Sequence, residues 1–196
     1  MRLDRIARHF ALAAVAVSTT HASAAVVHWS DANLVIPATF AGLYINVETR
    51  TTGSDKSLAG WDINPYGSGS ILWYSPTGEG MLQLPEYTGA SSLALGYVVD
   101  AGGTFLDDTT SEFVEGFDGF WQYNASNYFG FSFTASDGEL HYAWGRMVVG
   151  ATESNRVIAE IAYESEAGVG IAVGAVPAPG AIALLGIAGC LKRRRR

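Results

Sequence analysis

The fold is decided by the stretch YFGFSFT, residues 128–134, together with the segments ASDGE and LHYAWGRMVV that follow it directly. Aromatic residues alternate with small ones in this stretch. Because successive side chains of a strand point to opposite faces, Phe129, Phe131 and Phe133 lie on one face of a predicted strand. A face made only of phenylalanine rings is expected to pack against a core.

The segment after this strand predicts a hairpin. Asp137-Gly138 is a dipeptide typical of the tight turn between two antiparallel strands. On the return strand, Leu140 to Val149, the same alternation brings Leu140, Tyr142 and Trp144 together on one face.

A third strand is predicted over residues 157–164, after a polar turn. Alternation sets Val157, Ala159, Ile161 and Tyr163 on one face and Ile158, Glu160, Ala162 and Glu164 on the other. Three consecutive antiparallel strands are therefore expected over residues 128–164.

Shorter strands are predicted before residue 128. The candidates are Val26 to Trp29, Leu43 to Thr49, Trp61 to Asn64, Ile71 to Tyr74 and Met81 to Leu84. Gly, Ser, Thr and Asn separate these runs, no helical period interrupts them, and the Gly-rich stretches 67–70 and 78–80 are predicted hairpin turns. The pattern predicts an all-β fold, an antiparallel β-sandwich or jelly-roll-like domain over residues 25–175.

The N-terminus has the three parts of a Sec-type signal peptide, residues 1–24. Three arginines precede the apolar run 10–17, and Ala22 and Ala24 form an A-x-A cleavage site. The mature chain is expected to begin at Ala25. The alternative is that these residues form an N-terminal helix of the folded domain rather than a signal helix.

The C-terminus, residues 176–196, has the composition of a membrane-directed tail. It consists of Val176, Pro177, Ala178, Pro179 and Gly180, an apolar run to Leu191, Lys192, and then Arg193, Arg194, Arg195 and Arg196. Cationic residues stay in the cytoplasm, so this polarity leaves the body outside. The 12 residues 180–191 make a short hydrophobic helix of about 18 Å, against a hydrocarbon core of about 30 Å. Such a marginal span fits a temporary anchor, and the alternative is a core-facing helix with a solvated basic end.

This tail resembles the PEP-CTERM sorting signal, in which a Pro-x-Pro motif precedes an apolar stretch and a basic terminus. Ala178 stands where the family most often has Glu, which makes the tail a variant. The segments 61–66 and 128–163 also resemble parts of the ectodomains of this family. The resemblance implies processing by an exosortase at the inner membrane and delivery to the cell surface or the extracellular matrix.

Charge is distributed unevenly along the chain, whose formal net charge is −7. Outside the two terminal segments the strong cations are Arg50, Lys56, Arg146 and Arg156, against eighteen acids, which leaves the body near −14. Such a body is unsuited to nucleic acid and to anionic membranes, and it permits divalent cations. The single cysteine, Cys190, lies in the apolar tail, which leaves residues 25–175 without thiol chemistry or disulfides.

No assembled catalytic motif is visible in the sequence. After removal of the signal peptide only His28 and His141 remain, and neither Gly-x-Ser-x-Gly nor His-Glu-x-x-His occurs. His141 alternates with Tyr142 in a predicted strand, which favours a solvent-facing or hydrogen-bonded sheet residue over a catalytic base. We therefore predict a protein that is not an enzyme and that has no cofactor.

The densest acidic region, Asp107 to Asp118, leaves calcium open as a ligand. Carboxylates and hydroxyls crowd this segment, although their spacing fits no EF-hand, and a solvated acidic loop is the simpler interpretation. A glycosidase would pair Glu112 or Glu115 with Asp118 across a sugar bond, which the spacing alone does not distinguish from an ordinary acidic stretch.

Several aromatic residues are candidates for stacking on sugars. They are Trp61, Tyr66, Trp73, Tyr74, Phe120, Trp121 and Tyr123, with Trp121 as the position to test. Aromatic residues in strands also serve as core and cross-strand packing groups, which is the competing interpretation.

Two functions follow from these observations. The first is a non-enzymatic exported surface or extracellular-matrix protein, sorted by an exosortase and associated with exopolysaccharide or biofilm. The second is a carbohydrate-binding β-sandwich module or a weak glycan-active enzyme. A third possibility, a periplasmic protein held on the inner membrane, depends on whether the tail is removed.

Overall fold

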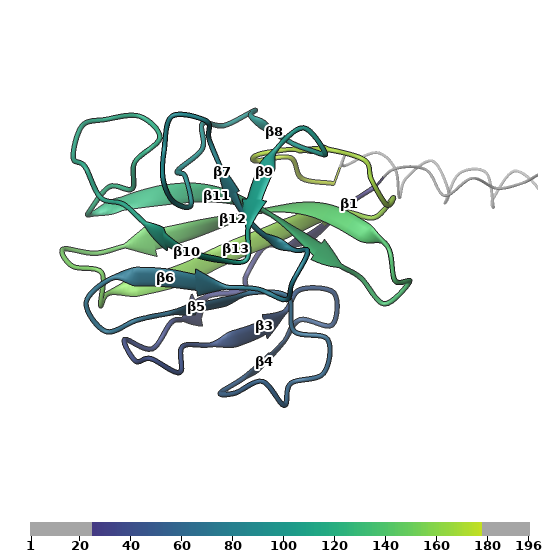
Figure 1. Ribbon diagram of the computed structural model, residues 1–196, viewed down its shortest axis with the longest axis horizontal. Helices are drawn as coiled ribbons and strands as arrows, with labels where there is room; N and C mark the ends of the chain where they lie inside the picture. Colours follow the sequence, from purple (N-terminus) through teal and green to yellow (C-terminus); the bar gives the residue numbers. More distant parts are fainter. Residues whose placement is uncertain (1–24, 178–196) are drawn as a thin grey trace, which may run out of the picture.

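The computed structural model describes residues 25–177, which form an all-β domain without helices (Figure 1). Every ladder between its strands is antiparallel. The prediction of an all-β, antiparallel fold is therefore confirmed. The predicted signal helix (1–24) and the predicted hydrophobic helix of the tail, together with its arginines (178–196), lie outside the described residues.

The largest sheet is built on the predicted hairpin. β11 (Ala125–Thr134) and β12 (Leu140–Val149) pair along their whole lengths, and β13 (Arg156–Glu164) pairs with β12. The sheet is completed by β1 (Val26–Trp29) and β2 (Leu34–Val35), which both pair with β13, and by β7 (Gly80–Gln83) and β9 (Thr104–Leu106) beyond β11. The three consecutive strands predicted from residue 128 onward are thus confirmed.

A second, smaller sheet faces the first. It has the order β10-β6-β5, formed by β10 (Asp108–Ser111), β6 (Ile71–Tyr74) and β5 (Asn64–Tyr66). The hairpin of β3 (Tyr44–Asn46) and β4 (Thr51–Gly53) lies beside it, because Ile45 forms a bridge with Ile63. Figure 1 shows these strands as a layer beneath the main sheet.

The main core lies between these two layers. Phe129, Phe131 and Phe133 are completely buried there, as the alternation predicted. Trp73 of the smaller sheet meets them, with its ring centroid 4.9 Å from that of Phe129. Burial of a phenylalanine side chain stabilises a fold by roughly 1.5–3 kcal/mol, so these rings are a main source of cohesion between the layers.

The opposite face of the main sheet is also buried. Tyr142 and Trp144 lie in a second core cluster, and Leu140 packs against it, which confirms that the three share one face. The cover comes from the pair β8 (Val98–Val99) and β14 (Ile171–Ala172). Gly130 of β11 faces this cover so closely that an added Cβ would lie 2.6 Å from Val99.

β13 departs from the predicted alternation. The register between β12 and β13 shifts after Arg146, before Met147, and Ala159 becomes an extra residue. A bulge of this kind reverses the faces of the side chains on either side of it. Ile158 and Ile161 therefore enter the same core cluster, although strict alternation placed them on opposite faces. For this strand the predicted division into two faces is wrong.

The earlier strands follow the predictions unevenly. Val26 to Trp29 and Ile71 to Tyr74 are confirmed, and the strand predicted from Met81 lies one residue earlier, as β7. The strand predicted over Leu43 to Thr49 is shorter, since β3 covers only Tyr44–Asn46. The Asn46 side chain accepts the Thr49 N–H (2.8 Å) and begins a turn there. β2, β4, β8, β9 and β14 were not expected, because strands of two or three residues carry almost no alternation. β10 was not expected because it lies in the acidic segment that was interpreted as a loop.

The strand predicted over Trp61 to Asn64 is wrong, since β5 begins only at Asn64. Pro65, which has no N–H to donate, is tolerated there because β5 is the edge of its sheet. Of the Gly-rich turns, 67–70 does join a hairpin, whereas 78–80 connects β6 to β7 in different sheets.

Gly145 should be intolerant of any side chain. It lies opposite Phe129 in the ladder, and an added Cβ would overlap the Phe129 ring. We expect Gly145→Ala to lower the free energy of unfolding by about 1–3 kcal/mol through overpacking. Gly69→Ala is the control, because open space surrounds that position. Urea unfolding of both variants measures the difference, and equal stabilities would contradict this packing.

Candidate functional site

A groove of about 470 Å³ lies between two chain segments at one end of the domain. One segment runs from β7 to β8 (residues 84–97), and the other is the loop between β10 and β11 (residues 114–122). Four aromatic residues line it, Tyr87, Tyr97, Phe117 and Phe120, together with the polar residues Ser92, Asp118 and Gln122. Aromatic walls with a few polar groups are typical of ligand sites.

Gln122 holds the loop 114–122 in one conformation. Its Nε2 donates to the carbonyl oxygens of Val114 (2.8 Å), Phe120 (3.1 Å) and Phe117 (3.2 Å). Its Oε1 accepts the N–H of Gly116 at 2.7 Å. One amide group thus replaces the hydrogen bonds that a regular element would have supplied to this backbone.

The loop is attached to the main sheet through Asn127. This side chain is buried in β11, where its Oδ1 accepts the Gln122 N–H (2.7 Å) and its Nδ2 donates to the Gln122 carbonyl (3.0 Å). The residue that organises the loop is therefore itself fixed by the longest strand pair of the domain.

Tyr87 joins the two sides of the groove. Its hydroxyl donates to the Asp118 carbonyl at 2.7 Å, and its ring meets Phe120 edge-on with centroids 4.8 Å apart. Gly119 adopts a φ of 84° beside this ring, and a Cβ there would overlap it. Ser92 adds a main-chain bond, since its N–H donates to the Gly119 carbonyl at 2.9 Å. The groove is therefore preformed.

Phe117 is the ring that the groove leaves free. It is 63% exposed, although the loop that carries it is hydrogen-bonded through Gln122. Of the described residues that line the groove, Asp118 alone carries a formal charge. The site thus offers an apolar ring face, phenolic and amide groups, and one carboxylate to a ligand.

Most of the aromatic residues proposed from the sequence lie elsewhere. Trp73 and Trp121 are completely buried, and the Trp121 Nε1 donates to the Ala90 carbonyl at 2.8 Å. The hypothesis that Trp121 contacts sugar is therefore wrong, because its faces are covered by Trp73 and Phe129. Of the seven proposed aromatics, only Phe120 lines the groove.

The other proposed rings have contacts outside the groove. Trp61 lies between Tyr44 and Tyr74, at centroid distances of 4.9 and 5.3 Å. Lys56 covers the Tyr74 ring, with Nζ 4.9 Å from the centroid. Tyr123 stacks on Phe113 at 4.5 Å, and the Tyr66 hydroxyl is 3.4 Å from an Asp108 carboxylate oxygen. The ring contacts of Trp61, Tyr74 and Tyr123 match the packing interpretation.

Sequence reasoning missed Tyr87, Tyr97 and Phe117 as lining residues. The available signal was GFDGF, residues 116–120, in which two glycines flank an aromatic residue next to an acid. Gly116 and Gly119 both have positive φ, the conformation of a tight irregular loop rather than a strand.

The acidic segment is only partly the predicted loop. Its first half contains β10 (Asp108–Ser111), which pairs with β6, and Asp118 at its end lines the groove. Glu112 accepts a hydrogen bond from the Thr88 hydroxyl. Within residues 25–177 no group of three or more His, Cys, Asp or Glu is arranged to hold a metal ion.

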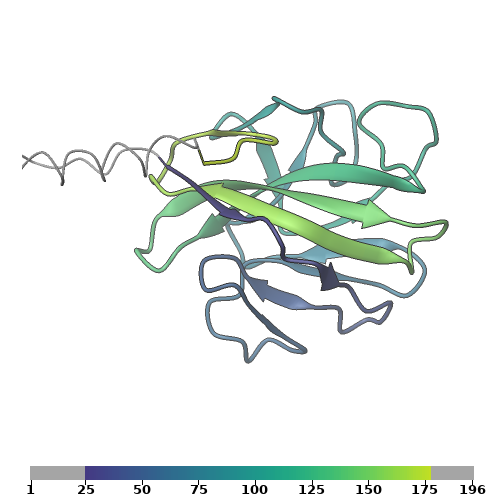
Figure 2. The ribbon, with the colours of Figure 1, turned by 180° about the vertical axis from the view of Figure 1, so that it is seen from behind.

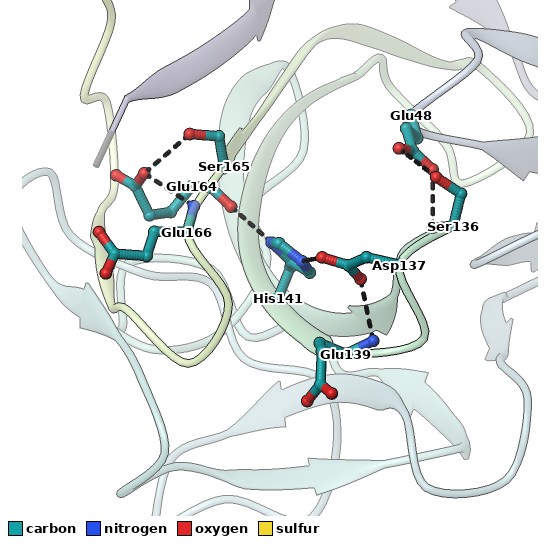
Figure 3. A network of polar contacts seen from close by, with 8 residues as sticks. All are labelled: Glu48, Ser136, Asp137, Glu139, His141, Glu164, Ser165 and Glu166. Atoms are coloured by element: carbon teal, nitrogen blue, oxygen red, sulfur yellow. Dashed lines mark hydrogen bonds and ion pairs between the residues drawn. The ribbon is translucent and has the colours of Figure 1, made fainter. Parts of the chain in front are cut away.

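His141 is a hydrogen-bonded sheet residue (Figure 3). It is 2% exposed, with Nδ1 2.8 Å from the Glu164 carbonyl and Nε2 3.2 Å from an Asp137 carboxylate oxygen. Both ring nitrogens of His141 thus have hydrogen-bond partners. Ser136, which precedes Asp137, binds Glu48 rather than His141, with Ser136 Oγ 2.8 Å from Glu48 Oε1. The structure therefore supports the hydrogen-bonded alternative and excludes the solvent-facing one.

Asp62 is a buried acid between β3 and the β11–β12 turn. It lines a cavity of about 130 Å³ that also contains Glu48 and Thr134. Burial raises the pKa of Asp62 to about 8, although the Val47 N–H opposes the shift, and the charges of Glu79 and Glu48 raise it further. Burial also raises the pKa of Glu79, against hydrogen bonds from Thr134. Asp62 therefore carries a proton near neutral pH.

Comparisons with family models, curated proteins and solved structures find no match for this chain. Among residues 25–177 there is no helix with the length and apolar character needed to cross a membrane.

Replacement of Asp62 should change how stability depends on pH. Between its ordinary pKa of 3.8 and about 8, the folded chain keeps a proton that the unfolded chain releases, so stability falls as pH rises through this window. Asp62→Asn can still accept the Val47 N–H without titrating. We expect it to match wild type near pH 3.5 and to exceed it by up to about 5 kcal/mol at pH 8.

Urea unfolding at a series of pH values measures this difference. Asp31→Asn, an exposed substitution in the turn after β1, is the control and should follow the wild-type profile. Parallel profiles for Asp62→Asn and wild type would show that Asp62 does not titrate in this window.

Proposed function

We propose that this chain is a non-enzymatic exported surface or extracellular-matrix protein whose domain binds exopolysaccharide in the groove. We class the domain, residues 25–175, as a β-sandwich of jelly-roll-like type. The observation that carries the proposal is the preformed groove with Phe117 exposed at its mouth. It favours the carbohydrate-binding alternative, while a purely structural unit would have no need of such a site.

Sugar rings match the chemistry of this groove. The C–H face of a hexose is apolar and packs on an aromatic ring, and its hydroxyls exchange hydrogen bonds with amide, phenol and carboxylate groups. Phe117 offers the free ring face, and Asp118 and Ser92 supply polar groups beside it. An elongated glycan suits a groove that is open to solvent better than a compact metabolite does.

The position of the groove suits presentation away from an attachment point. β11 begins beside the loop 114–122, and its ten residues span about 33 Å toward the other end of the sheet. At that other end Val26 pairs with Glu164. Figures 1 and 2 both show the purple start of the chain before β1 and the yellow end of the chain after β14 on the side opposite to this loop.

Export and sorting are proposed from the two termini. Cleavage after Ala24 would free Ala25 as the first residue, and the tail from Val176 to Arg196 would engage an exosortase-type enzyme in the inner membrane. Val176 is 53% exposed, and the preceding Ala175 is held by the Trp144 indole N–H at 3.2 Å. A tail that leaves the domain at an exposed residue is accessible to such an enzyme.

Loss of the Phe117 ring should weaken glycan binding. We expect Phe117→Ala to reduce the affinity for exopolysaccharide fragments about tenfold, the value of one aromatic stacking contact. Phe40→Ala is the matched control, since Phe40 is 77% exposed but does not line the groove. Isothermal titration of the full chain in mild detergent measures both.

The two variants distinguish glycan binding in the groove from nonspecific adsorption to exposed apolar side chains. Equal losses for both would indicate nonspecific apolar adsorption, and no binding by wild type to any glycan tested would reject the groove as a glycan site. Thermal midpoints equal to wild type would show that neither variant has lost its fold, as expected for exposed side chains.

The intact mass of the native protein tests the sorting proposal. We expect a mature chain that begins at Ala25 and has lost its arginines, because a 12-residue apolar run anchors only weakly. Mass spectrometry of the protein recovered from its own cells gives both ends. A chain that still ends at Arg196 would reject exosortase processing and favour retention on the inner membrane.

A further inference from the structure

We infer that the groove selects a glycan that carries free amines, such as a partly deacetylated hexosamine polymer, over uronate polymers. This inference rests on the proposed function of the groove and adds the chemical class of the ligand. It is drawn from the charge around Phe117 and Asp118, together with the location of the strong cations in the described domain.

Both segments that form the groove are acidic. No Lys or Arg occurs from Ser57 to Gly145, a range that contains both of them. The same range contributes Glu86 next to Tyr87 and Glu115 in the loop with Asp118, and all three acids are exposed. A cleft with charges of one sign concentrates ligands of the other sign and repels those of its own.

The four strong cations of residues 25–177 are engaged away from the groove. Arg156 is buried and donates to the carbonyl oxygens of Ser70 and Pro37 at 2.8 and 2.9 Å. Arg146 binds Glu160, with Nε 2.6 Å from Oε1. None of the four lines the groove, so none is positioned to neutralise a carboxylate of the ligand.

The remaining two cations have partners of their own. Lys56 lies over the Tyr74 ring, and the Arg50 guanidinium donates to the His28 carbonyl at 3.1 Å. A uronate polymer in the groove would therefore meet acids without a compensating cation, whereas an ammonium group would find a carboxylate.

An amino sugar satisfies both features of the site at once. Its ring face packs on Phe117, and its ammonium group lies within reach of the Asp118 side chain or over an aromatic face. A neutral sugar makes only the first contact. Discrimination should therefore come from Asp118, while Phe117 should contribute equally to charged and neutral glycans.

Titration of the full chain in mild detergent with three oligosaccharides of equal length tests this. The probes are a glucosamine oligomer, its fully N-acetylated form and an oligouronate, at low salt and about pH 5.5, where an ordinary aliphatic amine is protonated. We expect the amine form to bind about five- to tenfold more tightly than the acetylated form, and the uronate to bind least. Added salt should reduce only the preference for the amine.

Asp118→Asn should bring the amine and acetylated forms to similar affinity while binding of the acetylated form is retained. Asp31→Asn removes one acid outside the groove and should keep the preference. Equal affinity of wild type for the two forms, or tighter binding of the uronate, would overturn the inference and leave glycan binding intact. Equal effects of the two variants would also overturn it, since the preference would then reflect overall charge.

Discussion

The burial of the β11–β12 hairpin on both faces is the constraint on which the rest of the structure depends. One face carries Phe129, Phe131 and Phe133 against the smaller sheet, and the other carries Tyr142 and Trp144 under the β8–β14 pair. A strand pair covered on both sides excludes water from its main-chain hydrogen bonds and tolerates few changes in side-chain volume. The long strands therefore form the central support of the domain, and the loops extend from their ends.

The β11–β12 hairpin determines where the groove and the chain ends of the described domain lie. Asn127, near the start of β11, fixes Gln122, and Gln122 in turn holds the loop that carries Phe117. The other end of the same strands pairs with β1, close to the first residue of the predicted mature chain. The groove and the chain ends of the described domain therefore lie at opposite ends of the sheet, which agrees with the proposed binding of polymer outside the cell and the proposed processing of the tail at a membrane.

The acidic character of the domain gains meaning only after the basic groups are placed. Arg156 stabilises the turn between β5 and β6 from a buried position, and Arg146 is paired with Glu160. For Glu160, burial acts to raise the pKa, but the bonds from Arg146 and His28 outweigh it and keep the pKa low. Because these cations are bound elsewhere, the charged residues in the two segments of the groove are the carboxylates Glu86, Glu115 and Asp118.

The sequence by itself determined the all-β fold class and the hairpin at Asp137-Gly138, because both depend on neighbouring residues or on strict alternation. The signal peptide and the sorting tail are predictions of the same local kind. Only the tertiary structure decided the groove and the bulge at Ala159. Phe117 and Trp121 stand four positions apart, yet one is exposed and the other fully buried. The difference arises in a loop that has no repeating residue period, so alternation cannot predict it. Long-range contacts such as the hydrogen bond from Tyr87 to the Asp118 carbonyl determine the loop conformation.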